Sequence, residues 1–283
     1  MSVAVRRRVA SRAIRLDRSL EALPLFRLSD SAEDGVIAYS DDQGNRWRVL
    51  PSPGDRLPGT FDQDVYVELL RRYHEAGEPA DGCLTFTLHA FLRAMGRRVD
   101  GRTYEQLRSA LGRLERTMLE SQGLYESMAG GGRSDVRFTL LTTVAVERRR
   151  TLDRDQLPLF ESIAAAEPGV ARVVLSAVVR DNLAAEHIVS LSAPCYWSLD
   201  SPVARRLYRL LEVARAEERL TWRIGLDRLA AQLPLTQRYP SHLQRVLQPA
   251  HDMLVTAGVL RNVAFRQQQR AWFVDYMLGS RPA

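Results

Sequence analysis

Residues 220–277 read LTWRIGLDRLAAQLPLTQRYPSHLQRVLQPAHDMLVTAGVLRNVAFRQQQRAWFVDYM, and this stretch decides how the chain folds. Its apolar residues fall into short runs with the spacings of strands and helices. Pro240 suits the first turn of a helix, and Gly258 suits the position just after its end. The predicted elements are a strand, a short helix, a longer helix and two strands, over residues 220–224, 226–233, 240–257, 259–265 and 271–277.

The first half of the chain repeats this order. Leu84-Thr85-Phe86 aligns with Leu220-Thr221-Trp222 at an offset of 136 residues. A helix precedes each stretch, and these helices align at an offset of 138, with Val65 on Val203. Order and spacing together indicate a duplicated domain. Four further apolar pairs share the offset of 136: Leu107 with Leu243, Leu111 with Leu247, Met118 with Leu254 and Leu124 with Leu260.

The repeated unit is a helix, a short strand, two helices and a two-stranded hairpin. This is the order of a winged helix, in which a β-hairpin follows a helix-turn-helix. We therefore expect an α+β chain, mainly helical, made of two tandem winged-helix domains. In the first domain, Val136–Leu141 and Thr143–Arg148 would form the hairpin, after a helix that Gly123 ends.

Two segments precede the repeated units. Residues 1–20 carry six arginines and one aspartate, which predicts a flexible basic arm. Ile37–Ser40 and Arg46–Leu50 are typical of two strands around a polar turn. The expected divisions are a basic arm, a strand and loop extension, and two winged-helix domains, over residues 1–20, 21–60, 61–192 and 193–283.

Composition limits the class of function. The formal net charge is +6 and the isoelectric point is about 9.7, which suits an anionic partner such as nucleic acid. All 40 basic residues are arginine, so Walker A and Schiff-base chemistry, which need lysine, are excluded. No apolar run is long enough to span a membrane, and no apolar segment follows the N-terminal arginines as in a signal peptide. Because Cys83 and Cys195 also lie far apart, we expect a reduced, cytoplasmic protein without a membrane partner.

The second unit carries the stronger signals for DNA binding. Residues 201–283 hold 13 arginines against six acidic residues, a net charge of +7. The second helix of a helix-turn-helix presents its first residues to base edges, and arginine and glutamine form paired contacts with guanine and adenine. Pro249 should kink or split that helix, leaving its first two turns to read DNA. The predicted contacts on this helix and on the hairpin turn 266–270 are Arg238, Tyr239, Ser241, His242, Gln244, Arg245, Arg266, Gln268 and Arg270.

The first unit carries a weaker version of this pattern. Acidic residues such as Asp100 and Glu105 interrupt its basic residues, which indicates backbone contacts or use as a protein interface. A homodimer through this unit is one such use. The segment Gly130–Arg133 lacks the lysine and the flanking elements of a phosphate loop, so it predicts a wing tip. The predicted DNA contacts of the unit are Arg97, Arg98, Arg102, Tyr104, Arg108 and Arg133.

Catalysis finds little support in the sequence. A nicking enzyme needs paired histidines for a metal ion and a tyrosine nucleophile, but the five histidines are scattered. The two cysteines form no metal-binding pair. We expect no catalytic residue, metal site or cofactor.

Several segments resemble the replication initiator protein A family of plasmid initiators, relatives of the iteron-binding initiators. The resemblance runs from about Leu23 to Leu278. It implies tandem winged helices that bind repeated origin sites in double-stranded DNA. It also implies the host replication initiator and helicase as partners, and a monomer–dimer switch. The segments that carry it are Leu23–Phe26, Leu57–Val65, Leu114–Thr117 and, most specifically, Ser201–Leu211.

A transcriptional regulator of the same fold is the alternative, because a fold does not determine function. Direct repeats of roughly two helical turns beside the gene would favour the initiator. A promoter palindrome without such repeats would favour the regulator or autorepressor.

Overall fold

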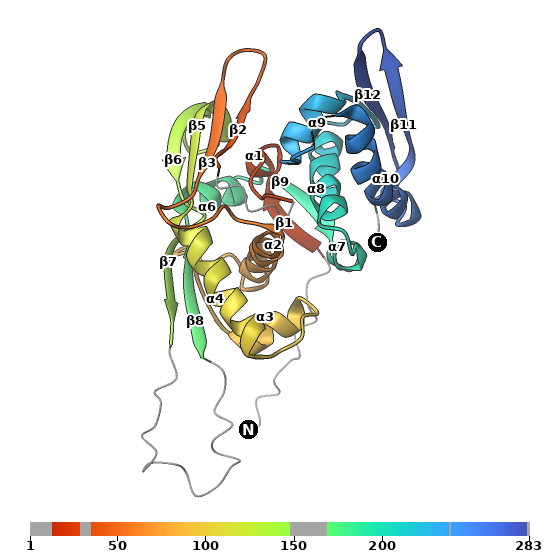
Figure 1. Ribbon diagram of the computed structural model, residues 1–283. Coiled ribbons are helices and arrows are strands. Elements are labelled where there is room, and N and C mark those ends of the chain that lie inside the picture. The colour runs from red at the N-terminus through yellow and green to blue at the C-terminus, as the bar shows by residue number, and fades with distance from the viewer. Residues whose placement is uncertain (1–12, 29–34, 148–168, 238, 282–283) are drawn as a thin grey trace, which may run out of the picture.

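The computed structural model describes residues 13–28, 35–147, 169–237 and 239–281. Helices hold 40% and strands 31% of these residues. The protein is therefore a mixed helix and sheet structure, and the expectation of a mainly helical chain is not supported. Figure 1 shows the elements of the first half on one side of the molecule and the last helices and strands on the other.

The first unit has three helices and a three-stranded antiparallel sheet. Its strands lie in the order β4-β8-β7, so the first strand pairs with the last. Gly77, with a positive φ of 83°, follows the C-terminal end of α2. The elements are α2 (Thr60–Glu75), β4 (Cys83–Thr87), α3 (Leu88–Ala94), α4 (Gly101–Arg116), β7 (Leu141–Val146) and β8 (Val170–Leu175).

The second unit has the same element order and the same strand order. Its sheet is antiparallel with the order β10-β12-β11. The predicted helix after Pro240 is confirmed, and it runs through Pro249 as one element rather than splitting there. The elements are α8 (Pro202–Ala216), β10 (Thr221–Gly225), α9 (Leu226–Gln232), α10 (Pro240–Thr256), β11 (Leu260–Gln268) and β12 (Ala271–Leu278).

The register of the repeat differs from the one predicted. Buried residues of α3 correspond to buried residues of α9 at an offset of 138, as in Leu88 and Leu226. Buried residues of α4 correspond to those of α10 at an offset of 140, as in Leu107 and Leu247. The offset of 136 is therefore wrong by about one helical turn in this helix. Leucines spaced four residues apart lie on one helical face, so a shift of one turn still superimposes apolar residues.

A four-stranded sheet interrupts the first unit, and the sequence did not predict it. Its order is β2-β3-β5-β6, with β2 at Ile37–Ser40, β3 at Arg46–Leu50, β5 at Met118–Ser127 and β6 at Gly132–Phe138. The predicted β2–β3 hairpin is confirmed.

The hairpin predicted for the first unit is wrong. Val136 pairs with Ser121 of β5, whereas β7 pairs with β8. The helix α4 ends at Arg116, before Gly123, because Thr117 is extended and the chain continues as β5.

The predicted basic arm is partly folded. Residues 1–12 of it lie outside the described part of the chain, but β1 (Ala13–Asp17) pairs with β9 (Ile188–Ser192), and α1 (Arg18–Glu21) follows β1. Ile14 and Leu16 are fully buried. Ile14 and Leu16 lie on either side of Arg15 and share a buried face of β1, so this part of the predicted arm is a strand of the fold.

One continuous hydrophobic cluster joins the two units. It includes residues of both α2 and α8, and α1 also packs against α8. Figure 1 shows α1 between the four-stranded sheet and α8. Two further helices, α6 (Ala177–Ala184) and α7 (Ala193–Ser198), flank β9 between the units.

Candidate nucleic-acid interface

The helix α10 begins at the surface with an open end. Tyr239 is its N-cap and is 70% exposed, and Pro240 occupies its first turn. No side chain caps this end, and its first turn holds no acidic residue. Pro240 has no N–H group, and the N–H groups of His242 and Leu243 donate to the Tyr239 carbonyl oxygen, so this end offers an anionic partner chiefly the positive end of the helix dipole.

The predicted reading residues gather on this end of α10. Ser241, His242 and Arg245 are exposed and Gln244 is partly exposed. The rings of Tyr239 and His242 meet edge to face, with centroids 5.7 Å apart. No carboxylate of the described residues pairs with Arg245. These side chains form a polar surface with an unpaired guanidinium, which can reach base edges or phosphates.

The opposite face of α10 fixes the helix in the second unit. Leu243 and Leu247 are buried, and so is His251. The His251 Nε2 atom lies 2.9 Å from the Tyr276 hydroxyl of β12. Burial lowers the pKa of His251 to about 4, so this imidazole is neutral near pH 7 and holds the helix without adding charge.

The β11–β12 hairpin belongs to the same unit. Its turn is shorter than predicted, because β11 continues to Gln268 and only Gln269 and Arg270 separate the strands. Arg266 pairs with Asp275 at 2.7 Å, and Gln268 accepts a hydrogen bond of 2.7 Å from Arg223. Arg270 is exposed at the turn. Of the three contacts predicted on this hairpin, Arg270 is the one whose side chain makes no hydrogen bond or ion pair with another described residue.

The corresponding helix of the first unit, α4, has a different N-terminal end. Asp100 caps it by accepting a hydrogen bond of 2.9 Å from the Thr103 backbone N–H. That hydrogen bond lowers the pKa of Asp100, so the carboxylate is ionised and occupies the positive end of the helix. Arg98 lies 3.5 Å from Asp100. An anionic partner would have to compete with this carboxylate, which makes α4 the weaker of the two candidate contacts.

Other predicted residues of the first unit have partners within the protein. Arg108 pairs with Glu105 at 2.5 Å, and the Tyr104 hydroxyl lies 3.4 Å from His89 Nδ1. Arg97 donates to Asp64 at 2.7 Å. Arg102 is exposed in the first turn of α4. Arg102 is thus the predicted contact of this unit best placed to meet DNA.

Two predicted contacts remain. Arg238 is outside the described residues. Arg133 is on β6, and its guanidinium is 4.0 Å from Asp41. The hairpin of the first unit is β7–β8, and the segment that joins these strands, residues 148–168, is outside the described part. The assignment of Arg133 to a wing tip is therefore wrong.

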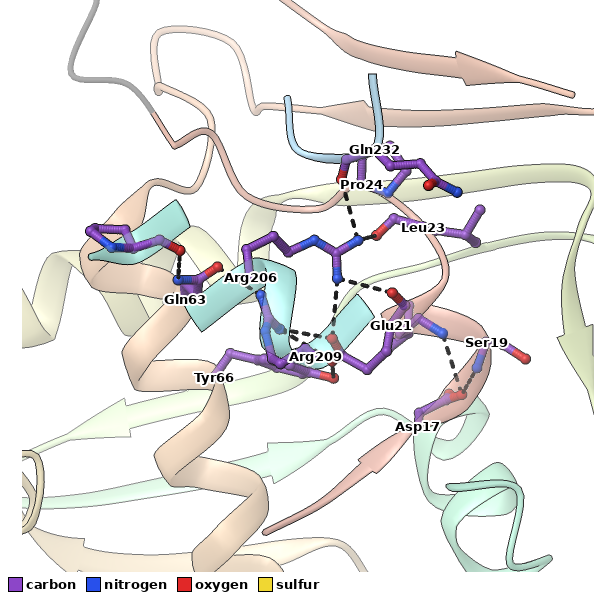
Figure 2. Close-up of polar contacts among 12 residues, drawn as sticks. Asp17, Ser19, Glu21, Leu23, Pro24, Gln63, Tyr66, Arg206, Arg209 and Gln232 are labelled. Carbon is purple, nitrogen blue, oxygen red and sulfur yellow. Dashed lines mark hydrogen bonds and ion pairs between the residues drawn. The ribbon is translucent and has the colours of Figure 1, made fainter. Parts of the chain in front are cut away.

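Two arginines that were counted toward a DNA-binding charge are buried. Arg206 and Arg209 of α8 are each 1% exposed. Figure 2 shows both of them converging on Glu21, which is also 1% exposed. Arg206 lies 3.3 Å and Arg209 3.0 Å from Glu21 Oε2. The Tyr66 hydroxyl of α2 donates to the same carboxylate at 3.0 Å.

Backbone and amide groups complete this cluster. Arg206 also donates to the carbonyl oxygens of Glu21 and Leu23, at 2.9 and 2.8 Å. Arg209 donates to the Gln63 side chain at 2.7 Å. Burial and the neighbouring Arg209 charge lower the pKa of Arg206 to about 10, so it stays protonated at neutral pH. The cluster joins α1, α2 and α8.

A second buried cluster lies beside the first. Asp64 of α2 accepts hydrogen bonds from Arg205 at 2.5 Å and from the Tyr196 hydroxyl at 3.2 Å. The net charge of +7 in residues 201–283 thus overstates the charge that can meet DNA, since Arg205, Arg206 and Arg209 neutralise acids of the first half. The sequence alone does not indicate this burial, because Arg205, Arg206, Arg209 and Glu212 occupy one side of an amphipathic helix, which is the usual pattern of a solvent-exposed face.

Two further features are absent from the described part of the chain. No helix there is both long and apolar enough to cross a membrane. Nor do three or more histidine, cysteine or acidic side chains gather there as they would around a metal ion.

The sequence and the fold are similar to those of known initiators. The family model for replication initiator protein A matches residues 15–253. No curated protein sequence gives a significant match. A structure of domains 2 and 3 of RctB has a TM-score of 0.51 and 14% identity, over 95% of this chain and 99% of that chain. The Pi initiator protein, solved in complex with iteron DNA, has a TM-score of 0.55 and 11% identity, over 96% and 99%. At these identities the likeness shows a shared fold.

Proposed function

The chain belongs to the replication initiator protein A family, and we propose that it starts replication of a plasmid or secondary replicon by binding repeated origin sites in duplex DNA. In this proposal each of the two units is a winged helix, and binding depends on DNA sequence. The helix α10 reads the major groove, and α4 makes a second, weaker contact. No catalytic step by this chain is part of the proposal.

The repetition of the two units supports the tandem winged helix. Both have the order helix, strand, helix, helix and two strands, and in both sheets the first strand pairs with the last. The shared fold with the Pi initiator, which was solved bound to iteron DNA, supports duplex DNA as the partner.

The observation that carries the proposal is the surface at the start of α10. Its open N-terminal end, the exposed Tyr239 and His242 and the unpaired Arg245 are contiguous along the first two turns. Helix-turn-helix proteins place this part of the second helix against base edges. Arg270, which is exposed at the hairpin turn of the same unit, can contact the phosphate backbone.

Binding to a fluorescent duplex that carries one of the repeats beside the gene tests this proposal. Arg245→Ala should weaken binding about 10- to 100-fold if the guanidinium contacts a guanine. Arg56→Ala removes the same charge from an exposed position on the loop after β3 and is the matched control. A scrambled duplex of equal length should bind more weakly than the repeat, and affinity should fall steeply with salt.

Two outcomes would count against the proposal. If Arg238→Ala/Arg245→Ala binds the repeat as tightly as the wild type, α10 is not the reading helix. If the protein binds the repeats but a plasmid with the Arg245→Ala gene is maintained normally, the protein regulates transcription rather than starting replication.

The proposal includes the protein partners that the family implies. These are the host replication initiator and helicase, and a second copy of the chain that docks through the first unit. Crosslinking of the full chain on and off repeat DNA would test the homodimer.

A further inference from the structure

A cleft of about 510 Å³ lies between the four-stranded sheet and the second unit. Tyr39 and Arg133 line its sheet side, and Trp222, Arg228 and Gln232 line the side of the second unit. Figure 1 shows α1 between these two walls, and residues just after α1 also line the cleft. The volume lies in the range of small-molecule sites.

Arginines are the main charged groups of the cleft. Four of them line it together with two acidic residues, Asp41 and Glu217, and Asp275 and Asp42 pair with Arg223 and Arg228 at 3.5 and 3.2 Å. The arginines are Arg133, Arg219, Arg223 and Arg228, whose side chains are 46–59% exposed. Arg228 pairs at 3.2 Å with Asp42, which is itself 92% exposed, and Arg133 is 4.0 Å from Asp41. Exposed pairs of this kind are weak, so the guanidiniums remain available to a phosphate group, which they can bind through two parallel hydrogen bonds.

Two further features of the cleft indicate that a ligand would carry a planar ring as well as a phosphate group. Trp222 stacks one face of its ring on Tyr276, with centroids 5.5 Å apart and an angle of 22° between the planes, and it also borders the cleft. The side-chain oxygen of Gln232 is buried, and no donor of the described residues reaches it. A buried acceptor without a donor is costly. Because Gln232 lines the cleft, rotation of its side chain would bring this oxygen to an amino group on a planar ring beside the aromatic wall.

We propose that this cleft binds a nucleotide with an amino-bearing base. The phosphates lie among Arg133, Arg219 and Arg228, and the base lies against Trp222 with its amino group directed at Gln232. This site is separate from the DNA surface of α10. Because its walls come from the four-stranded sheet and from the second unit, a bound nucleotide also holds these two parts together.

Titration of ADP into the full chain, followed by calorimetry, tests the site. ADP should bind and raise the melting temperature, because a ligand of the folded state stabilises it. Uridine diphosphate lacks the exocyclic amine and should bind more weakly, and pyrophosphate more weakly still. The absence of ADP binding, or equal binding of pyrophosphate and ADP, would overturn the proposal.

Variants separate this cleft from other basic surfaces. Arg228→Ala should weaken ADP binding about 10- to 100-fold, as expected for the loss of a charge-assisted hydrogen bond. Gln232→Leu keeps the side-chain volume close and should remove the preference for ADP over uridine diphosphate. Arg137→Ala changes an arginine of the same sheet that is 72% exposed and does not line the cleft, and it should bind ADP like the wild type. Melting curves of each variant without ligand identify any that fails to fold.

Duplex DNA provides the last arm of the test. A saturating concentration of the repeat duplex should not displace ADP, and Arg245→Ala should bind ADP like the wild type. If the duplex displaces ADP, the nucleotide occupies the DNA surface, and the cleft is not its site. If the protein does not bind the repeat duplex, that result contradicts the proposed initiator function. It does not affect the nucleotide site, which the ADP titration tests by itself.

Discussion

At the scale of single residues, Glu21 is central to the stability of the fold. Its buried carboxylate is shared by the guanidiniums of Arg206 and Arg209 and accepts a hydrogen bond from Tyr66. Removing one partner of a buried ion pair leaves an uncompensated charge in the interior. Here one change would leave two such charges.

Glu21→Gln should therefore destabilise the protein strongly. The amide keeps the shape but not the charge, and we expect a loss of about 3–5 kcal/mol in the free energy of unfolding, measured with urea. Glu105→Gln breaks an exposed pair with Arg108 and should cost less than about 1 kcal/mol. Equal effects of the two changes would show that the buried cluster does not hold α1 against α8.

Asp17 should make stability depend on pH. It is fully buried, and burial raises its pKa to about 7 from an ordinary value of 3.8. The folded protein then keeps a proton up to about pH 7 that the unfolded chain releases near pH 4. The contribution of Asp17 to stability is full below that lower value and declines as the pH rises to about 7, by roughly 1.4 kcal/mol per pH unit.

Urea unfolding at pH 5, 6, 7 and 8 measures this effect. Asp17→Asn cannot titrate, so the wild type should lose stability relative to the variant between pH 5 and 7. A difference between the two proteins that stays constant over this range would contradict a raised pKa for Asp17.

At the scale of elements, α10 keeps a proline inside a helix that is otherwise regular. Pro249 is exposed, and α10 continues past it to Thr256. A proline in a helix interior lacks the N–H that would donate to the carbonyl four residues earlier, which is that of Arg245. The helix is therefore weakened just beyond the two turns proposed to read DNA.

Pro249→Ala should stabilise the protein. Restoring the hydrogen bond at an exposed site, where no packing is lost, should add about 1–3 kcal/mol. Thermal unfolding measures this gain. Affinity for the repeat should stay within about twofold, and a large loss of affinity would show that the proline shapes the reading surface.

At the scale of the whole molecule, the two units share one interior. A continuous hydrophobic cluster and two buried ion-pair clusters cross between them. The sequence indicates two tandem domains. In the structure, contacts among α1, α2 and α8 join these two units.

Unfolding should consequently be a single cooperative transition. Tryptophan fluorescence reports on both parts, since Trp47 lies in the four-stranded sheet and Trp222 in the second unit. Urea curves from fluorescence and from far-ultraviolet circular dichroism should coincide. Two separated transitions would indicate that the units unfold independently.

Local patterns in the sequence determined much of the architecture. The element order of the second unit, the start of α10 at Pro240 and its end before Gly258 follow from periodicity and from helix-end residues. The exposure of Tyr239, His242 and Arg245 also follows, because Leu243 and Leu247 define the opposite face of the same helix. These properties depend on residues within a few turns of one another, so the sequence alone specifies them.

Contacts between residues far apart in the sequence decided the pairing of the strands and the burial of the arginines. β1 pairs with β9 at Leu16 and Val189, far apart in the chain, and β7 pairs with β8 rather than with the adjacent segment that holds Val136. A strand pattern shows which face is buried but not which strand lies beside it. Likewise, charge alone does not show whether an arginine meets solvent or a buried acid, as Arg206 and Glu21 do. The sequence by itself therefore determined which side chains of α10 are exposed. Only the tertiary structure decided which arginines of the chain are free to contact DNA and which pair with buried acids.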